Sequence, residues 1–170
     1  LENIYVILIL MAALMFLDYY LTLKGYKLAK ENYLKHFIIE SYELNPRFKK
    51  SITENRYNFK HLFYLIYCCG FTYLTYYLAM NNWIWNLDNF FMIPGIIFSV
   101  FISINARHIQ NIILFKAINK DPTIISGKVT EKQIFVIKAS NAQDWGLFFI
   151  FSFIFLMFPS HFTFGFAIGP

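Results

Sequence analysis

The positively charged residues of this chain are confined to two stretches. All fifteen Lys and Arg residues lie within residues 24–60 and 107–138, and the segments outside these stretches are dominated by Phe, Leu, Ile and Tyr. Cytoplasmic loops of integral membrane proteins carry such an excess of basic residues, whereas the segments that cross the bilayer avoid them. The segregation therefore predicts a multi-pass integral membrane protein whose two basic stretches face the cytoplasm.

The composition also fits a membrane protein. Hydrophobic residues make up 58% of the 170 residues and charged residues 15%, whereas a soluble domain has roughly 25% charged residues. A water-soluble core of this size cannot enclose all twenty-one Phe and twelve Tyr side chains, but lipid-facing positions accept them. At this length we expect a single domain, residues 1–170.

We predict an all-α fold, a bundle of four transmembrane helices with helical cytoplasmic extensions. Each span supplies the roughly twenty residues that a helix needs to cross a bilayer core. The predicted spans are about residues 4–22, 62–80, 84–106 and 145–166. The basic loops are then residues 23–60 and 107–144, and both termini lie outside.

The third span has two interpretations. If it begins near Ile84 or Phe90, Pro94 kinks its outer part, and Arg107 and His108 lie at the cytoplasmic interface. If Pro94 opens the helix, the span covers residues 94–118 and the same two residues lie near mid-membrane. An unpaired Arg there costs at least about 2.5–3.5 kcal/mol, so we favour the first interpretation.

Packing between spans is less defined by the sequence. No Gly-x-x-x-Gly pattern falls within a predicted span, so close helix packing at small residues has little support. Few polar residues line the spans, so an aqueous pore would need several copies, and we expect a homo-oligomer. The second span carries Cys68, Cys69 and Thr72, which makes it the least lipid-like span and the best candidate for the interface between copies.

Polar residues gather near the cytoplasmic ends of the first and third spans, and the predicted topology places them at similar depth. Residues three or four apart share a helix face, as Asp18 and Thr22 do on the first span and His108 and Asn111 on the third. We expect the whole set to converge on one site. Its members are Asp18, Thr22, Glu43, Asn45, Asn105, Arg107, His108 and Asn111.

Several roles are open for this set. An acid inside a span is a functional hypothesis with a named partner, and Arg107 is the expected partner of Asp18. His108 is a candidate proton carrier, because imidazole changes charge near neutral pH. Asp18, Glu43 and His108 are also candidate ligands of a divalent metal, as mixed nitrogen and oxygen donors. In the structural alternative, an Asp–Arg pair only locks two helices together. The cofactor stays unknown.

The pattern Asp18-x-x-x-Thr22, then Gly25, then Glu43-Leu44-Asn45-Pro46 resembles one found in small uncharacterised prokaryotic membrane proteins. In those proteins an Asp and a Thr in the first span precede a Glu-x-Asn-Pro. The resemblance covers roughly residues 1–50, and the interval between Thr22 and Glu43 is longer here. It implies that these polar positions act together, and it implies no activity.

The leading functional interpretation is an oligomeric channel or a transporter-like subunit. One alternative is a membrane-embedded enzyme that acts on a lipid or peptide at the cytoplasmic face, with Asp18 or Glu43 as acid or base and Arg107 as an anion clamp. Another is a membrane anchor or assembly protein. The expected partners are membrane lipids, with anionic headgroups at the basic loops. Nucleic acid is not expected, because the positive-inside bias accounts for the basic charge.

Overall fold

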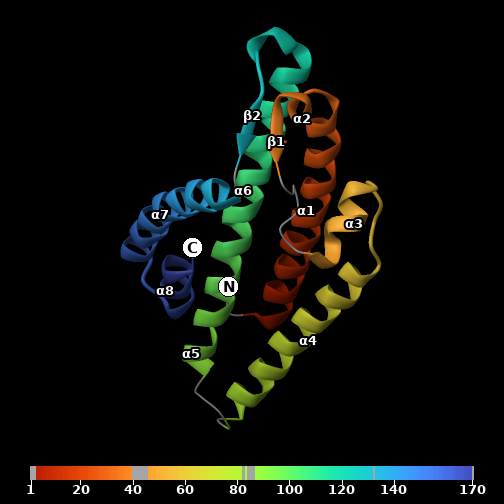
Figure 1. The fold of residues 1–170 in the computed structure, drawn as a ribbon. Helices are drawn as coiled ribbons and strands as arrows, with labels where there is room; N and C mark the ends of the chain where they lie inside the picture. Colours follow the sequence, from red (N-terminus) through yellow and green to blue (C-terminus); the bar gives the residue numbers. More distant parts are fainter. Residues whose placement is uncertain (1–2, 40–45, 82, 84–86, 132, 170) are drawn as a thin grey trace. The chain divides into compact units, whose positions relative to one another are not determined.

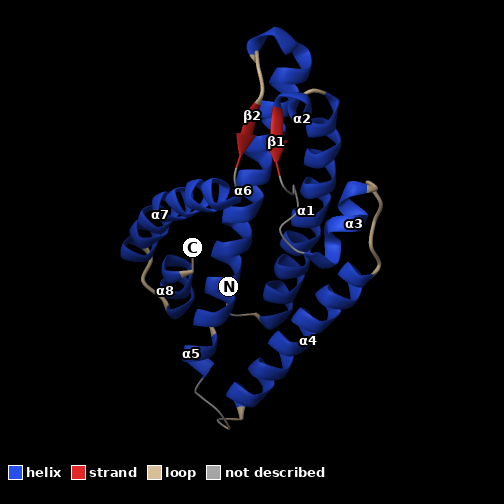
Figure 2. Cartoon of the chain, in the orientation of Figure 1, coloured by secondary structure: helices blue, strands red, loops and turns tan. Residues whose placement is uncertain are grey.

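The described residues form an all-α fold apart from one small sheet, which confirms the all-α part of the predicted fold class (Figures 1 and 2). The computed structural model describes residues 3–39, 46–81, 83, 87–131 and 133–169. The helices are α1 (Ile4–Glu31), α2 (Tyr33–His36), α3 (Pro46–Thr53), α4 (Lys60–Met80), α5 (Leu87–Phe90), α6 (Met92–Lys120), α7 (Gln133–Met157) and α8 (His161–Ile168), with a 3-10 helix at Pro122–Ile124. The strands are β1 (Phe37–Ile39) and β2 (Val129–Glu131).

Three helices, α1, α4 and α6, are long and apolar enough to cross a membrane. These three candidate spans indicate a multi-pass membrane protein. The predicted second span coincides with α4 to within two residues at its start. The first continues past its predicted end as a single helix to Glu31, so the beginning of the first basic stretch is a helical extension of that span, as predicted.

The third span departs from our favoured interpretation. Its helix begins at Met92, eight residues after the predicted start near Ile84 and two after the alternative start near Phe90, and it continues past Ala106 to Lys120. Pro94 lies in the first turn of α6, where its missing N–H would have had no helical partner. A helix of 29 residues is about 43 Å long, which exceeds a hydrocarbon core of about 30 Å. Arg107 and His108 consequently lie near the middle of α6 rather than at its end.

The predicted fourth span, residues 145–166, is not one helix. Helix α7 ends at Met157 and α8 begins at His161. Ser160 starts α8 with a capping box, in which its Oγ accepts from the Thr163 N–H at 3.1 Å and its own N–H donates to Thr163 Oγ1 at 2.9 Å. The eight residues of α8 extend about 12 Å, which is too short to cross a bilayer. Within the described residues, the apolar part of α7, Asp144–Met157, is also shorter than a span, so three candidate spans are found there.

Strands β1 and β2 pair in parallel, with Phe37 opposite Val129 and Ile39 opposite Glu131. They lie in the two predicted cytoplasmic loops, where we expected only helical extensions. Just before the strands, His36 Nδ1 lies 3.0 Å from the carbonyl oxygen of Gly127. Because a carbonyl only accepts, this nitrogen carries the hydrogen. Gly127 has a φ of +83°, a left-handed conformation that glycine adopts without a steric penalty.

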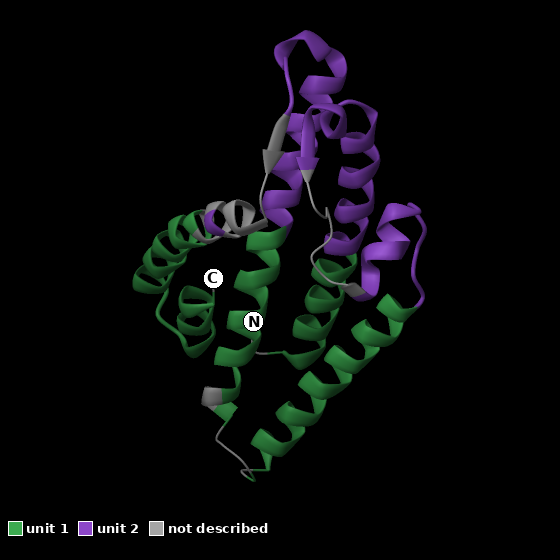
Figure 3. Ribbon diagram, in the orientation of Figure 1, with its two compact units in different colours: residues 1–16, 60–104, 142–170 green, residues 17–59, 105–141 purple. Residues whose placement is uncertain are grey.

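The chain divides into two compact units, and each is described separately (Figure 3). Unit 1 comprises residues 1–16, 60–104 and 142–170, and unit 2 comprises residues 17–59 and 105–141. Helices α1, α6 and α7 contribute residues to both units. The single domain expected from the chain length stays a prediction.

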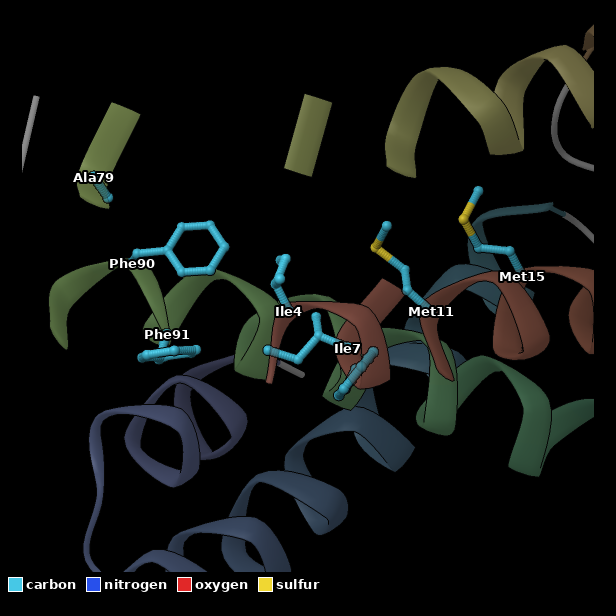
Figure 4. Close-up of a cluster of buried hydrophobic side chains, with 8 residues drawn as sticks. Ile4, Ile7, Met11, Met15, Ala79, Phe90 and Phe91 are labelled. Atoms are coloured by element: carbon cyan, nitrogen blue, oxygen red, sulfur yellow. The ribbon is translucent and has the colours of Figure 1, made fainter. Parts of the chain in front are cut away.

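The core of unit 1 is a cluster of buried apolar side chains (Figure 4). Helix α1 contributes a stripe at helical spacing, so one face of the helix is buried. Its members are Ile4, Ile7, Met11 and Met15. Helices α4, α5 and α6 add Ala79, Phe90 and Phe98, and Phe91 joins the cluster from the turn between α5 and α6. The neighbours of the stripe along α1, such as Tyr5 and Ile9, are exposed, as expected of a lipid-facing surface.

Helix α4 turns its polar face toward α1. Thr72 is buried and donates to Met11 Sδ at 3.7 Å, and Cys69 Sγ lies 4.0 Å from the carbonyl oxygen of Leu8. This finding differs from our expectation that the same residues would form the interface between copies. The exposed face of α4 is apolar and aromatic, with Phe63, Ile66, Tyr67, Phe71 and Leu74.

Helices α6 and α8 approach backbone to backbone through glycines. A Cβ added to Gly165 would overlap the carbonyl oxygen of Met92, and one added to Gly95 would overlap that of Phe162. A Cβ on Gly169 would lie 2.7 Å from the carbonyl oxygen of Ile96. Gly165 and Gly169 form a Gly-x-x-x-Gly pattern that runs beyond the predicted end of the fourth span. Close packing at small residues therefore holds these two helices together, although we found little support for it in the sequence.

In unit 2, Asn119 of α6 holds the C-terminal end of α1. Its Nδ2 donates to the carbonyl oxygen of Leu28 at 3.0 Å and to Glu31 Oε2 at 2.7 Å. The Leu28 carbonyl belongs to the last turn of α1, where no later N–H of the helix is available. The Asn119 side-chain amide thus donates a hydrogen bond to a carbonyl that has no donor within α1.

Replacing Asn119 with Ala is expected to lower the free energy of unfolding by about 1–2 kcal/mol, because both hydrogen bonds are lost. The matched control is Asn111→Ala, a change of the same type on α6 at an exposed residue, and it should have little effect. Chemical denaturation of both variants in the same detergent measures the difference. Equal losses in the two variants would contradict the role of Asn119.

The start of the 3-10 helix is capped by Asp121. Its Oδ1 accepts from the N–H of Thr123 at 3.0 Å and also from the Thr123 hydroxyl. These hydrogen bonds, the hydroxyl first and the backbone N–H second, lower the pKa of Asp121. Because the ionised form is the better acceptor, the cap is strongest above the ordinary carboxylate range and weakens as the pH falls through it.

Candidate functional site

The candidate site lies in unit 2 and is centred on an acid–imidazole pair. His108 Nε2 of α6 lies 3.0 Å from Asp18 Oδ1 of α1, and the side chains are 21% and 28% exposed. We expected Arg107 as the partner of Asp18, but in the structure the partner is His108. Successive residues of a helix point about 100° apart, so two neighbours cannot both face the same carboxylate.

Thr22 completes the contact from one turn further along α1. Its hydroxyl donates to the carbonyl oxygen of Asp18 at 2.9 Å and lies 3.1 Å from His108 Nε2. A hydroxyl has one hydrogen, and the Asp18 carbonyl takes it, so toward His108 the Thr22 oxygen acts as the acceptor. His108 Nε2 therefore carries a hydrogen that is shared between the Asp18 carboxylate and the Thr22 hydroxyl.

The other ring nitrogen of His108 is enclosed. Nδ1 is shielded from solvent, and no described residue forms a hydrogen bond with it. With Nε2 already protonated, a second proton on Nδ1 converts the ring into an imidazolium. The Asp18 carboxylate on the opposite edge of the ring stabilises that cation.

The other predicted residues are placed differently. Asn105 is buried, while Asn111 is exposed. Arg107 is half-buried, and none of the described acids forms an ion pair with it. Glu43 and Asn45 lie outside the described residues, so the predicted metal ligand set is described only in part. Within the described ranges, no three His, Cys, Asp or Glu side chains gather as metal ligands.

Tyr19, next to Asp18 in the chain, has a structural role in unit 2 that we did not predict from the sequence. Its hydroxyl lies 3.2 Å from Ser51 Oγ and accepts from the N–H of Asn58 at 3.1 Å. The side chain is buried, and a buried tyrosine hydroxyl normally has a hydrogen-bond partner. The sequence offered no sign of that partner, because Ser51 and Asn58 lie more than thirty residues away.

The geometry differs from that of a nucleophilic triad. In a Ser-His-Asp site the carboxylate binds Nδ1 and the nucleophilic hydroxyl binds Nε2, so the ring stands between them. Here Asp18 and Thr22 share the same nitrogen, and the Thr22 hydrogen points to a backbone carbonyl. The ring therefore does not activate the hydroxyl. The arrangement is suited to holding a proton between two helices.

Comparisons with models of known protein families, with curated proteins and with solved structures find no match to this chain. The resemblance to small prokaryotic membrane proteins accordingly stays a prediction. The features that bear on function are the geometry of the site and the three helices that could span a membrane.

Proposed function

We propose that this chain is the subunit of a membrane transporter in which the Asp18–His108 pair binds and releases a proton. The observation that carries the proposal is the 3.0 Å contact between two ionisable side chains on α1 and α6, two of the helices long enough to cross a membrane. In this proposal the basic stretches face the cytoplasm, following the positive-inside rule.

The position of the pair supports this assignment. Asp18 lies near the middle of α1 and His108 near the middle of α6. Ionisable side chains within membrane helices are costly and rare, and they commonly mark ion pathways or proton relays. A pair that only tied two helices together could use Lys or Arg in place of His108, whereas imidazole is a common proton shuttle.

A change of charge in the pair provides the link to conformational change. When Nδ1 is protonated, an imidazolium and a carboxylate join α1 and α6 as an ion pair, and when it is not, a neutral imidazole donates a hydrogen bond to the carboxylate. The first is the stronger interaction. Protonation therefore shifts the balance between two arrangements of the helices, which is how a local charge change drives a switch.

The interior of unit 1 favours a transporter over a wide pore within one copy. Thr72 bonds Met11, Ser99 Oγ donates to the Ile96 carbonyl at 2.8 Å, and Ser103 Oγ donates to the Ser99 carbonyl at 2.8 Å. These described hydroxyls are thus used inside the protein rather than along an aqueous path. A channel would have to form between copies, and we expect a homo-oligomer in either case.

The test is proton movement in liposomes that contain the purified protein and an internal pH-sensitive dye. Na⁺, K⁺ and small carboxylates are supplied in turn as the coupled solute, and a pH gradient is imposed. Asp18→Asn and His108→Ala should abolish the flux, whereas Arg107→Gln, at the neighbouring position, should retain it. Light scattering of the purified protein gives the number of protomers per particle.

Two results would overturn the proposal. One is a wild-type flux no greater than that of protein-free liposomes with every solute. The other is a flux that both substitutions leave unchanged while the proteins insert normally. A loss of thermal stability without any wild-type flux would instead assign the pair to helix packing, as in the structural alternative.

A further inference from the structure

We infer that residues 47–59 of unit 2, called here the basic hairpin, form a docking surface for anionic phospholipid headgroups. The segment consists of most of α3 and the chain that returns from its C-terminal end. It carries four basic residues and one acid, a net charge that suits a negative surface. This inference is independent of the proton site proposed above.

One face of α3 is fixed to α1. Ile52 is 1% exposed, and the ring of Phe48 packs edge-on against Tyr19 at a centroid distance of 5.6 Å. Ser51 Oγ donates to the Phe48 carbonyl at 2.8 Å, so it accepts from the Tyr19 hydroxyl. These contacts set the orientation of the helix and leave its opposite face to solvent.

That opposite face is cationic. Arg47, Lys49 and Lys50 are all exposed. The helical repeat places Lys49 and Lys50 away from the Phe48, Ser51 and Ile52 side. Across the described part of the chain, no carboxylate forms an ion pair with Lys49 or Lys50. Their charge is consequently available to an external anion.

The return of the chain adds a fourth cation, Arg56. The N–H of Asn55 donates to the Ile52 carbonyl and that of Arg56 to the Ser51 carbonyl, both at 2.9 Å. Asn55 has a φ of 51°, so this end of α3 is a Schellman motif. It reverses the chain immediately before Arg56, which is exposed.

Tyr19 also fixes the returning segment. The ring of Tyr57 packs edge-on against Tyr19 at 5.2 Å, and the N–H of Asn58 donates to the Tyr19 hydroxyl at 3.1 Å. Both arms of the hairpin are therefore held by one buried side chain. The cations are presented on an ordered scaffold, so little conformational entropy is lost when an anion binds.

Exposed aromatic rings indicate a lipid rather than another polyanion. Phe59 is 74% exposed and Tyr57 41%, and the two rings meet edge-on at 5.9 Å. Aromatic side chains beside basic residues are typical of segments that lie at the membrane interface. The next residue, Lys60, begins the candidate span α4, so the chain enters the bilayer directly after the hairpin.

The experiment uses the full chain in a neutral detergent, titrated with phosphatidylglycerol or phosphatidylcholine and followed by native mass spectrometry. Each basic residue near an anionic surface strengthens binding about fivefold. Lys49→Gln/Lys50→Gln should therefore weaken phosphatidylglycerol binding by about 25-fold and leave phosphatidylcholine binding unchanged. The control, Lys27→Gln/Lys30→Gln, removes two exposed charges from α1 and should have little effect.

Two further variants separate the scaffold and the rings from charge alone. Tyr19→Phe keeps every charge but loses the hydroxyl, and it should weaken phosphatidylglycerol binding. Phe59→Ser should weaken binding of both lipids. Circular dichroism confirms that each variant is folded.

The inference is overturned by equal affinity for the two lipids or by equal losses in the two double variants, which would show diffuse attraction. It is also overturned if inorganic phosphate displaces the lipid at equal concentration, or if an RNA oligonucleotide binds more tightly than phosphatidylglycerol.

Discussion

Replacing Gly165 with Ala is expected to lower the free energy of unfolding by about 1–3 kcal/mol, the usual cost of forcing a methyl group into a packed interior. The added Cβ would overlap the Met92 carbonyl, and the backbone of α6 cannot move aside as a flexible side chain would. Gly95→Ala should have a similar effect, because it introduces the same clash from the opposite helix. Thermal unfolding in one detergent, followed by circular dichroism, measures both.

The chain supplies its own controls for this prediction. A Cβ added to Gly70 of α4 or Gly146 of α7 would meet no atom within 4 Å. In these helices Ala should leave stability unchanged or raise it by about 0.5–1 kcal/mol, because Gly costs that much relative to Ala in a helix interior. The two pairs of variants should thus shift in opposite directions. Equal melting temperatures in all four would refute the close approach of α6 and α8.

The second large effect is expected at the Asp18–His108 pair, where each substitution leaves a half-buried polar group without its partner. Asp18→Ala and His108→Ala should each cost about 1–3 kcal/mol. The double variant should cost less than the sum of the two single variants, with a coupling energy of about 1–2 kcal/mol.

A double-mutant cycle between Asp18 and Arg107 is the matched comparison. Arg107 is the neighbour of His108 and carries a permanent charge, so a long-range attraction to Asp18 would appear in its cycle as well. The structure pairs Asp18 with His108 alone among the described residues, and the Arg107 cycle should show no coupling. A stronger coupling for Arg107 would restore the pairing that the sequence predicted.

Apolar length was sufficient to predict α1 and α4, since an uninterrupted run of this kind has few alternatives to a membrane helix. It was not sufficient for α6. For α6 we gave more weight to the cost of an unpaired Arg in the membrane than to the tendency of Pro94 to begin a helix. The predicted start of this helix was therefore too early in the chain. For the fourth span, the sequence did not show that α8 packs back onto α6 through Gly165.

The candidate site was predicted at the level of its residues but not of its contacts. Asp18, Thr22 and His108 do converge in unit 2, as their helical spacing suggested. The choice between His108 and Arg107 depends on the rotation of α6 about its axis, which only tertiary packing determines. The pairing of β1 with β2 was missed for a related reason, because two three-residue strands far apart in the chain give almost no local signal.

The parallel sheet sets an order of events during synthesis. Strand β1 cannot pair until β2 has been synthesised, because α4 and α6 lie between the two strands in the chain. At a usual rate of about 5–20 residues per second, roughly 5–20 s of translation separate the two strands. During that interval Ile38, which is 53% exposed even in the folded protein, belongs to an unpaired strand edge of the kind that recruits other chains. Unit 2 can therefore close only after both intervening helices have been inserted, and a ribosome that stalls within α6 would leave β1 for chaperones or proteases to recognise.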